Sequence, residues 1–190
     1  IHDIYDGTII IKAIARKAGE RSKVAVYSKD PNVDPAGACI GPNGSKIQKI
    51  VSQLGNGQTK EKIDVITWSE NVSLFIMEAL KPAVVLGINV DEATKNALVI
   101  VDNNSYSVAI GRRGINVNLA VRLTGYKIDI KTEEDAIEEG IEYKTLEVIQ
   151  SEEIALKAQR IREAQLEAIQ KDDATTLPGL PEDYVAPLDR

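Results

Sequence analysis

The feature that most constrains this chain of 190 residues is an internal repeat. Residues 38–47 align with residues 108–117, and both segments contain the pattern Gly-x-x-Gly. The same offset holds further along the chain, where Gly55 aligns with Gly125. A repeat that keeps its spacing beyond a single motif indicates two copies of one structural unit. We therefore expect two small domains of the same fold rather than one large domain.

The hydrophobic pattern predicts the same order of elements in both copies. Apolar residues at helical spacing after each glycine pair predict a helix that ends at Gly55 or Gly125. Short β-rich runs bounded by turn residues predict three strands per copy, two of them paired as a hairpin before the glycine pair. The predicted strands are residues 8–14, 23–27 and 62–68 in the first copy and 83–90, 97–101 and 127–131 in the second. Residues 71–80 are expected to form a helix that leads into the second copy.

The C-terminal part differs in character from the two copies. Residues 133–172 are rich in charged residues, with apolar residues at spacings of three to five, which predicts an amphipathic helix with breaks. Residues 177–183 contain proline and glycine and are expected to be extended or disordered. These patterns predict an α+β chain with domains at 1–69 and 70–132, each a three-stranded sheet covered by helices, and an acidic helical extension with a flexible tail at 133–190.

The two glycine pairs are suited to holding a sugar-phosphate backbone. A glycine has no side chain, so a ligand backbone can approach closely, and the helix that follows can present its N-terminal N–H groups to a phosphate. Neighbouring aliphatic residues could then form a shallow groove for unstacked bases. A single Gly-x-x-Gly is a weak signal, but two copies in the same structural context make two unrelated turns improbable.

This pattern resembles the signature of the KH family of RNA-binding domains. That signature consists of an aliphatic residue, Gly-x-x-Gly, two further residues and another aliphatic residue. In this chain it occurs at residues 40–47 and 110–117. The position of the hairpin before the loop resembles the bacterial, type II form of that fold. Residues 34–41, 109–111 and 118–125 further resemble the tandem KH region of the NusA family of bacterial transcription elongation, termination and antitermination factors.

The resemblance covers about residues 4–132 and implies RNA binding in transcription. It implies single-stranded RNA, in the form of the nascent transcript, as one partner and RNA polymerase as another. The chain begins with Ile1 rather than Met, so we expect a fragment, with polymerase contacted through missing upstream domains.

The resemblance and the local chemistry together predict an RNA-binding set in and beside each loop. The first copy contributes Ile40, Gly41, Pro42, Asn43, Gly44, Ser45, Lys46 and Lys49. The second copy contributes Ile110, Gly111, Arg112, Arg113, Gly114, Asn116, Asn118 and Arg122. The first loop has no charge of its own, so Lys46 and Lys49 are expected to replace it, whereas the second loop carries two arginines.

Composition excludes several other functions. Aromatic residues make up only 4%, so base recognition should rest on aliphatic and backbone groups. One Cys and one His cannot form a zinc set or an intrachain disulfide. Because Gly44 is followed by Ser and Lys in the wrong order for a nucleotide-binding loop, and no catalytic or metal-ligating constellation is visible, we expect no enzyme, no cofactor and no metal. With no apolar run of membrane-spanning length, a cytoplasmic protein is expected.

Single residues outside the loops have less specific interpretations. Cys39 is expected to be a small core residue, and Trp68, although it could stack a base, is expected to pack against a neighbouring domain.

The charge is unevenly distributed. Residues 1–130 contain 16 basic and 13 acidic residues, and residues 131–190 contain 7 and 16. The acidic extension could compete with RNA for the basic loops, or it could be a solvated tail. Two alternatives to a transcription factor also remain at this stage: a protein-interaction module that docks a partner through the acidic helix, and a ribosome-associated KH protein.

Overall fold

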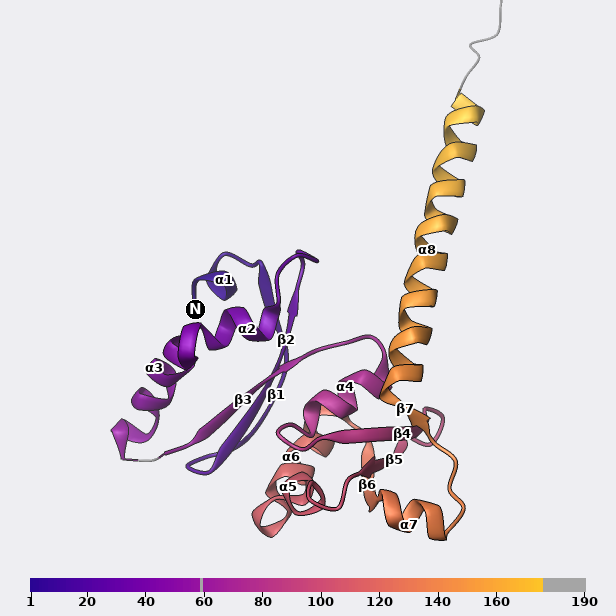
Figure 1. Cartoon of the computed structure of the whole chain (residues 1–190). Helices are drawn as coiled ribbons and strands as arrows, with labels where there is room; N and C mark the ends of the chain where they lie inside the picture. Colours follow the sequence, from indigo (N-terminus) through magenta and orange to yellow (C-terminus); the bar gives the residue numbers. More distant parts are fainter. Residues whose placement is uncertain (59, 176–190) are drawn as a thin grey trace, which may run out of the picture. The chain divides into compact units, whose positions relative to one another are not determined.

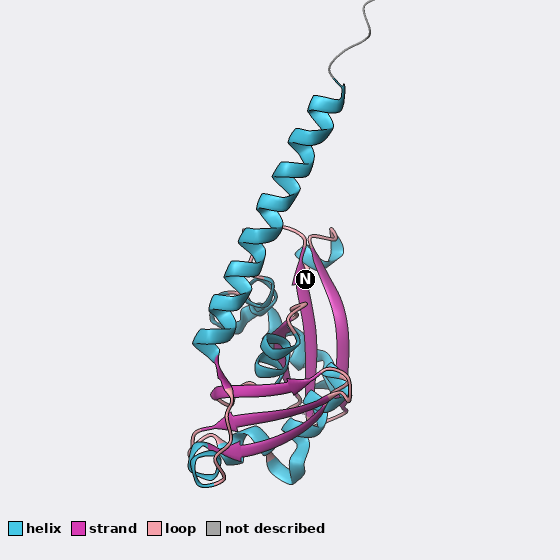
Figure 2. Cartoon of the chain, turned by 90° about the vertical axis from the view of Figure 1, so that its right-hand side faces the viewer, coloured by secondary structure: helices cyan, strands magenta, loops and turns pink. Residues whose placement is uncertain are grey.

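A computed structural model describes residues 1–58 and 60–175 of the chain. Its strands form two separate sheets, each accompanied by helices (Figures 1 and 2). The compact unit that contains both sheets spans Ile1–Ile149. The fold is α+β with two mixed sheets and a long C-terminal helix, as the sequence predicts, and the three predicted strands of each copy lie in one sheet, although the second sheet has a fourth strand. The prediction for residues 177–183 lies outside the described residues.

The first copy begins with a short helix and a hairpin. In chain order its elements are α1 (His2–Tyr5), β1 (Ile9–Lys17), β2 (Arg21–Ser28), α2 (Pro35–Ile40), the 3₁₀ turn η1 (Pro42–Gly44), α3 (Ser45–Gln53), the 3₁₀ turn η2 (Leu54–Gly57) and β3 (Lys62–Thr67). Strands β1 and β2 are antiparallel, and β3 lies parallel to β2 on its other side. The two helices between β2 and β3 carry the chain across the sheet, which is what a parallel pair requires.

The second copy repeats this arrangement. Its elements are α4 (Val72–Ala79), β4 (Val85–Asp91), β5 (Asn96–Val101), α5 (Tyr106–Ile110), the 3₁₀ turn η3 (Arg112–Gly114), α6 (Ile115–Thr124) and β6 (Lys127–Thr132). Strand β5 pairs antiparallel with β4 and parallel with β6. Asn71 caps the start of α4 because its side chain accepts a hydrogen bond from the Leu74 N–H, and Gly125, with φ of 75°, caps the end of α6.

The chain after β6 contains a strand that the sequence pattern did not predict. Helix α7 (Glu133–Glu138) starts with a capping box between Thr132 and Asp135. Strand β7 (Lys144–Thr145) then pairs antiparallel with β4, and it adds a short fourth strand to the second sheet. Gly87 in β4 permits this approach, since a Cβ there would collide with the Tyr143 ring.

Helix α8 (Leu146–Thr175) confirms the expected long helix after a break. Its first turn belongs to the compact unit, where Ile149 is buried. From Gln150 onward the helix belongs to a second unit, and its side chains are mostly exposed as far as Lys171.

The hydrophobic core is shared unequally between the copies. The larger cluster contains residues of α4, the second sheet, α5 and α6, and also Ala15, Ala25 and Ile66 of the first sheet. The smaller cluster lies between the first sheet and its own helices, and consists of Ile9, Val26, Cys39 and Val65. One face of the first sheet therefore packs against the second copy, so the two copies form one packed structure.

Candidate nucleic-acid interface

The two glycine loops have the same backbone conformation. Gly41 and Gly111 both have φ of 74° and ψ of 171°, a region that is essentially restricted to glycine. Gly44 and Gly114 both have φ of 73°, in the left-handed region. Two segments 70 residues apart thus adopt one strained conformation, which indicates a shared requirement on the backbone.

The residues between the glycines point their side chains to solvent. Pro42, Asn43, Arg112 and Arg113 are all exposed. Asn43 and Arg113 have φ of 50° and 55°, in a region that asparagine enters more readily than arginine. Neither loop arginine has an ion-pair partner within the described part of the chain. The second loop therefore presents two positive charges, and the first presents none.

A helix starts directly after each loop, at Ser45 in α3 and at Ile115 in α6. The residue before each helix is glycine, so no side chain caps the first turn. The N–H groups of a first turn have no partner within the helix, and together with the helix dipole they favour an anion. The N–H groups of Ser45 and Ile115 already donate to the carbonyl oxygens of Pro42 and Arg112 in the 3₁₀ turns, so each loop places the positive end of a helix dipole beside an approachable glycine backbone.

The aliphatic residues that flank the loops are partly exposed. Ile40 is 36% exposed and Val108 is 41% exposed, while Ile110 is half-buried. Ser45 and Lys49 of α3 and Asn118 of α6 are exposed and lie on the helices that follow the loops. Arg122 is exposed and donates from Nη1 to the carbonyl oxygen of Arg16 at 3.4 Å, so it lies where α6 meets the first copy.

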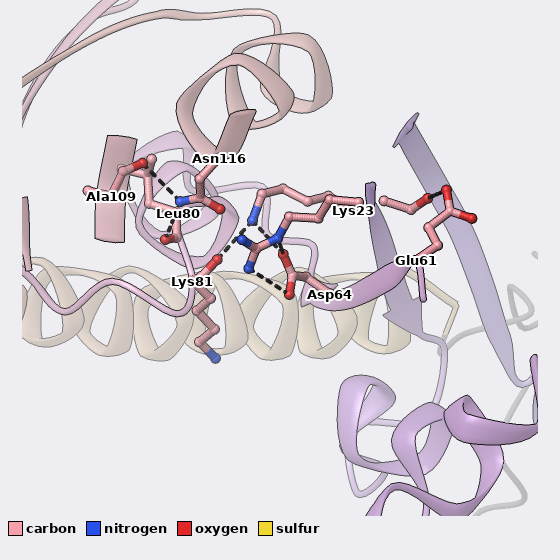
Figure 3. A network of polar contacts seen from close by, with 9 residues as sticks. Lys23, Glu61, Asp64, Leu80, Lys81, Ala109 and Asn116 are labelled. Atoms are coloured by element: carbon pink, nitrogen blue, oxygen red, sulfur yellow. Dashed lines mark hydrogen bonds and ion pairs between the residues drawn. The ribbon is translucent and has the colours of Figure 1, made fainter. Parts of the chain in front are cut away.

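Asn116 does not lie at the surface, contrary to its inclusion in the predicted RNA-binding set. Its side chain is completely buried, and Nδ2 donates to the carbonyl oxygens of Leu80 at 3.0 Å and Ala109 at 2.9 Å (Figure 3). It also packs under Gly111, where a Cβ would lie 2.8 Å from the Asn116 Cβ. Asn116 therefore holds the loop in place and is not available to touch RNA.

Lys46 occupies the equivalent position in the first copy, and its charge is only partly available to a ligand. Its Nζ donates to the Ala38 carbonyl oxygen at 3.0 Å and contacts Asp3 at 3.2 Å, with 40% of the side chain exposed. The expectation that Lys46 supplies the charge missing from the first loop is weakened, because Asp3 already neutralises part of it. Lys49 has no ion pair within the described residues and is the better candidate.

Cys39 and Trp68 have the packing roles expected from the sequence. Cys39 is 1% exposed in the smaller core cluster, and burial raises the pKa of its thiol. Trp68 packs edge-on against Tyr27 and tilted against Phe75, and the Lys12 Nζ lies 4.3 Å from its ring centroid. Both residues therefore contribute to packing rather than to the loops.

A buried polar network that the sequence pattern did not reveal lies where the two copies meet (Figure 3). Lys23 of β2 is fully buried, and its Nζ bonds Asp64 at 2.9 Å and the Lys81 carbonyl oxygen at 2.8 Å. Arg21 makes a bidentate pair with the same Asp64. The sequence held one signal of this network, because Lys23 is a charged residue at a strand position whose side chain faces inward.

The described residues contain no group of His, Cys, Asp and Glu that could hold a metal ion. Among the same residues, no helix is both long enough and apolar enough to cross a membrane.

Comparison with known proteins identifies both copies. Residues 1–68 match the NusA-like first KH domain and residues 72–138 match the NusA-like second KH domain. The transcription termination/antitermination protein NusA of Halalkalibacterium halodurans is 48% identical over 141 residues, which are 74% of this chain and 36% of that protein. NusA of Bacillus subtilis is 48% identical over 147 residues, 77% of this chain and 38% of that protein.

The chain thus spans a little over a third of the length of these relatives. Both matched models describe KH domains. A solved structure titled "Crystal structure of APE1850" aligns with a TM-score of 0.49 and 22% identity over 69% of this chain and 94% of that chain, a likeness too weak to bear on function.

Proposed function

This chain belongs to the NusA family, of which it is a tandem KH region, and from this membership we propose that it binds single-stranded RNA through its two glycine loops. The observation that carries the proposal is the pair of loops with identical backbone angles, each followed by an uncapped helix start. The positive end of a helix attracts a phosphate, and glycine lets the RNA backbone come close.

The proposed RNA-contacting set is smaller than the set predicted from sequence. It contains the loop residues, the exposed residues of the following helices and the flanking aliphatic residues. These are Ile40, Gly41, Pro42, Asn43, Gly44, Ser45, Lys46, Lys49, Ile110, Gly111, Arg112, Arg113, Gly114, Asn118 and Arg122. Asn116 is left out because it is buried. Bases would lie against aliphatic surface, since KH domains recognise unstacked bases of single strands.

We place this activity in transcription, with the nascent transcript as the RNA. The support comes from the relatives, which are named as transcription termination/antitermination proteins. RNA polymerase is the corresponding protein partner. The chain would hold the transcript while other parts of such a factor contact the enzyme, and it would act where transcripts are made, in the cytoplasm of a bacterial cell.

Replacing the loop side chains with aspartate tests the proposal. The variant Pro42→Asp/Asn43→Asp/Arg112→Asp/Arg113→Asp adds negative charge where phosphates would bind and keeps all four glycines. A hydrogen bond to a charged group contributes roughly 1.5–3 kcal/mol, so losing two arginine contacts should weaken RNA binding by about 100-fold or more. Fluorescence anisotropy with a labelled single-stranded RNA of about ten nucleotides measures this.

A matched control separates the loops from net charge. Lys157→Glu/Arg162→Glu/Lys171→Glu changes the net charge by the same amount on α8, outside both matched KH domains, and its RNA affinity should be close to that of the wild type at 150 mM salt, which screens long-range charge effects. A loop variant that is folded by circular dichroism and binds RNA as well as the wild type would refute the proposal.

A second candidate function is protein docking through α8. Ile154, Ile161 and Ile169 of this helix are 68%, 58% and 59% exposed, and their spacing of seven and eight residues places them on one face of the helix. Truncation after Ile149 should then abolish binding of purified RNA polymerase while RNA affinity is retained. Polymerase binding that survives the truncation would remove this candidate. A rise in RNA affinity at low salt would instead show that the acidic part competes with RNA.

A further inference from the structure

Lys23 lies in an environment where the burial of a lysine side chain has a high free-energy cost. Its side chain is 0% exposed, and burial lowers the pKa of its amino group, with Asp64 opposing that effect. Burying an ammonium group costs several kcal/mol unless it is paired and hydrogen-bonded. A buried ion pair is often no more stabilising than apolar residues of similar volume, so stability alone does not explain the lysine.

The fold itself does not require a charge at this position. In the parallel register Lys23 lies opposite Asp64, and the corresponding pair of the second sheet is Leu98 opposite Asp129. The second copy thus places leucine where the first has lysine, and it still forms the same sheet. The reason for Lys23 must lie in a contact that Leu98 does not make.

That contact is the bond to the second copy. Lys23 Nζ bonds the Lys81 carbonyl oxygen, just beyond the C-terminal end of α4, where unpaired carbonyls and the helix dipole favour a cation. The adjacent carbonyl, of Leu80, accepts from Asn116, which packs directly under Gly111 of the second loop. Two neighbouring carbonyls therefore connect the first sheet to the base of the second loop (Figure 3).

We propose that Lys23 is a positioning residue for RNA binding: its bond to Lys81, beside the Asn116 bond to Leu80, fixes the second loop relative to the first copy so that one RNA strand engages both loops. This inference rests on the proposed function. Two sites held in a fixed relation bind one ligand more tightly than either alone, by up to about 10²–10⁴-fold, and this gain falls when the geometry becomes loose.

The test compares a short and a long RNA on Lys23→Met. A single-stranded RNA of about four nucleotides fits one glycine loop, and one of about twelve can reach both. Methionine fills the site of the lysine stem but makes neither polar bond. The ratio of long-RNA to short-RNA affinity should fall about tenfold in this variant, while the short RNA binds as it does to the wild type.

Arg21→Met is the matched control. Arg21 binds the same Asp64 and carries the same charge, but the structure gives it no bond to the second copy. It should therefore keep the wild-type ratio of affinities. A loss of stability without a positioning effect would lower both affinities together and leave the ratio unchanged, so the ratio distinguishes positioning from folding.

The possible outcomes distinguish a positioning role of Lys23 from a role in stability. Equal ratios in Lys23→Met and the wild type overturn the positioning role. A Lys23→Met chain that fails to fold, with Lys23→Leu failing as well, also overturns it, because Lys23 would then act through stability. A wild type that binds neither RNA marks the failure of the proposed function itself, which is distinguishable from the failure of this inference.

Discussion

The two copies share a loop conformation but differ in how that loop is held. In the first copy Lys46 reaches from α3 to Ala38 and to Asp3 of α1 through a partly exposed ion pair. In the second copy Asn116 reaches from α6 to Ala109 and to Leu80 beyond α4 through buried hydrogen bonds. Each loop is thus tied to the helix that precedes its own hairpin, once by exposed charge and once by a buried amide.

The helices after the loops show the same contrast. Helix α3 has no buried residue, whereas α6 buries Asn116, Leu119, Ala120 and Leu123. Beside α3 lies an apolar cavity of about 140 Å³ between the helices and sheet of the first copy. Helix α6 is better packed because it is covered by its own sheet and by the first sheet as well. Identical loop geometry can therefore rest on supports of different rigidity.

Substitution of the first glycine in each loop should have the largest effect on stability. A Cβ at Gly111 would meet both the Cβ and the backbone N of Asn116 at 2.8 Å, whereas at Gly41 it would meet the flexible Lys46 chain. We expect Gly111→Ala to lower the free energy of unfolding by about 3 kcal/mol and Gly41→Ala by about 2 kcal/mol in urea titrations.

Gly125→Ala is the control for backbone strain alone. Gly125 has φ of 75° and no atom within 4 Å of its added Cβ, so about 1 kcal/mol is expected. Equal losses at Gly41 and Gly111 would contradict the difference in rigidity.

Removal of the two tethers should have unequal effects. Asn116→Ala removes both side-chain hydrogen bonds, to the Ala109 carbonyl oxygen and to that of Leu80, which still accepts from the Ala83 N–H, and should cost about 2 kcal/mol. Lys46→Ala removes an exposed ion pair and should cost under about 1 kcal/mol, with the loss shrinking as salt rises. Thermal unfolding at low and high salt measures both. A Lys46 effect as large as that of Asn116 would show that the two loops are held equally firmly.

Acid should weaken the first copy through an ion pair that the second lacks. A hydrogen bond from Arg16, with a further one from Ser22, lowers the pKa of Glu61, whose side chain is buried. Because the pKa is lower in the folded state, the stabilisation is present above the ordinary value of 4.5 and is lost as pH falls through the folded pKa.

Glu61→Gln should therefore flatten the decline of melting temperature below about pH 4.5. Glu20→Gln, which alters an exposed pair with Lys17, should leave that decline unchanged. This is the smallest of the expected effects, and an identical acid response in Glu61→Gln and the wild type would contradict it.

Local and repeated features were predictable from the sequence, and contacts between the copies were not. The glycine pairs, the hairpins and the helix ends follow from periodicity and turn residues, which act over a few residues. The burial of Asn116 depends on the Leu80 carbonyl, 36 residues away in sequence, and that of Lys23 on Lys81, 58 residues away. Strand β7 has two residues, too few to give a periodic signal.

The central claim, that two loops bind the RNA backbone, is tested most directly by RNA affinity across a salt series. For a single-stranded RNA of about ten nucleotides, the logarithm of affinity should fall with the logarithm of salt by about 0.7 per phosphate neutralised. Arg112→Asp/Arg113→Asp should reduce that slope by about 1.4, and Pro42→Asp/Asn43→Asp should lower affinity with a smaller change of slope. Unchanged affinity and slope in both variants would contradict the account.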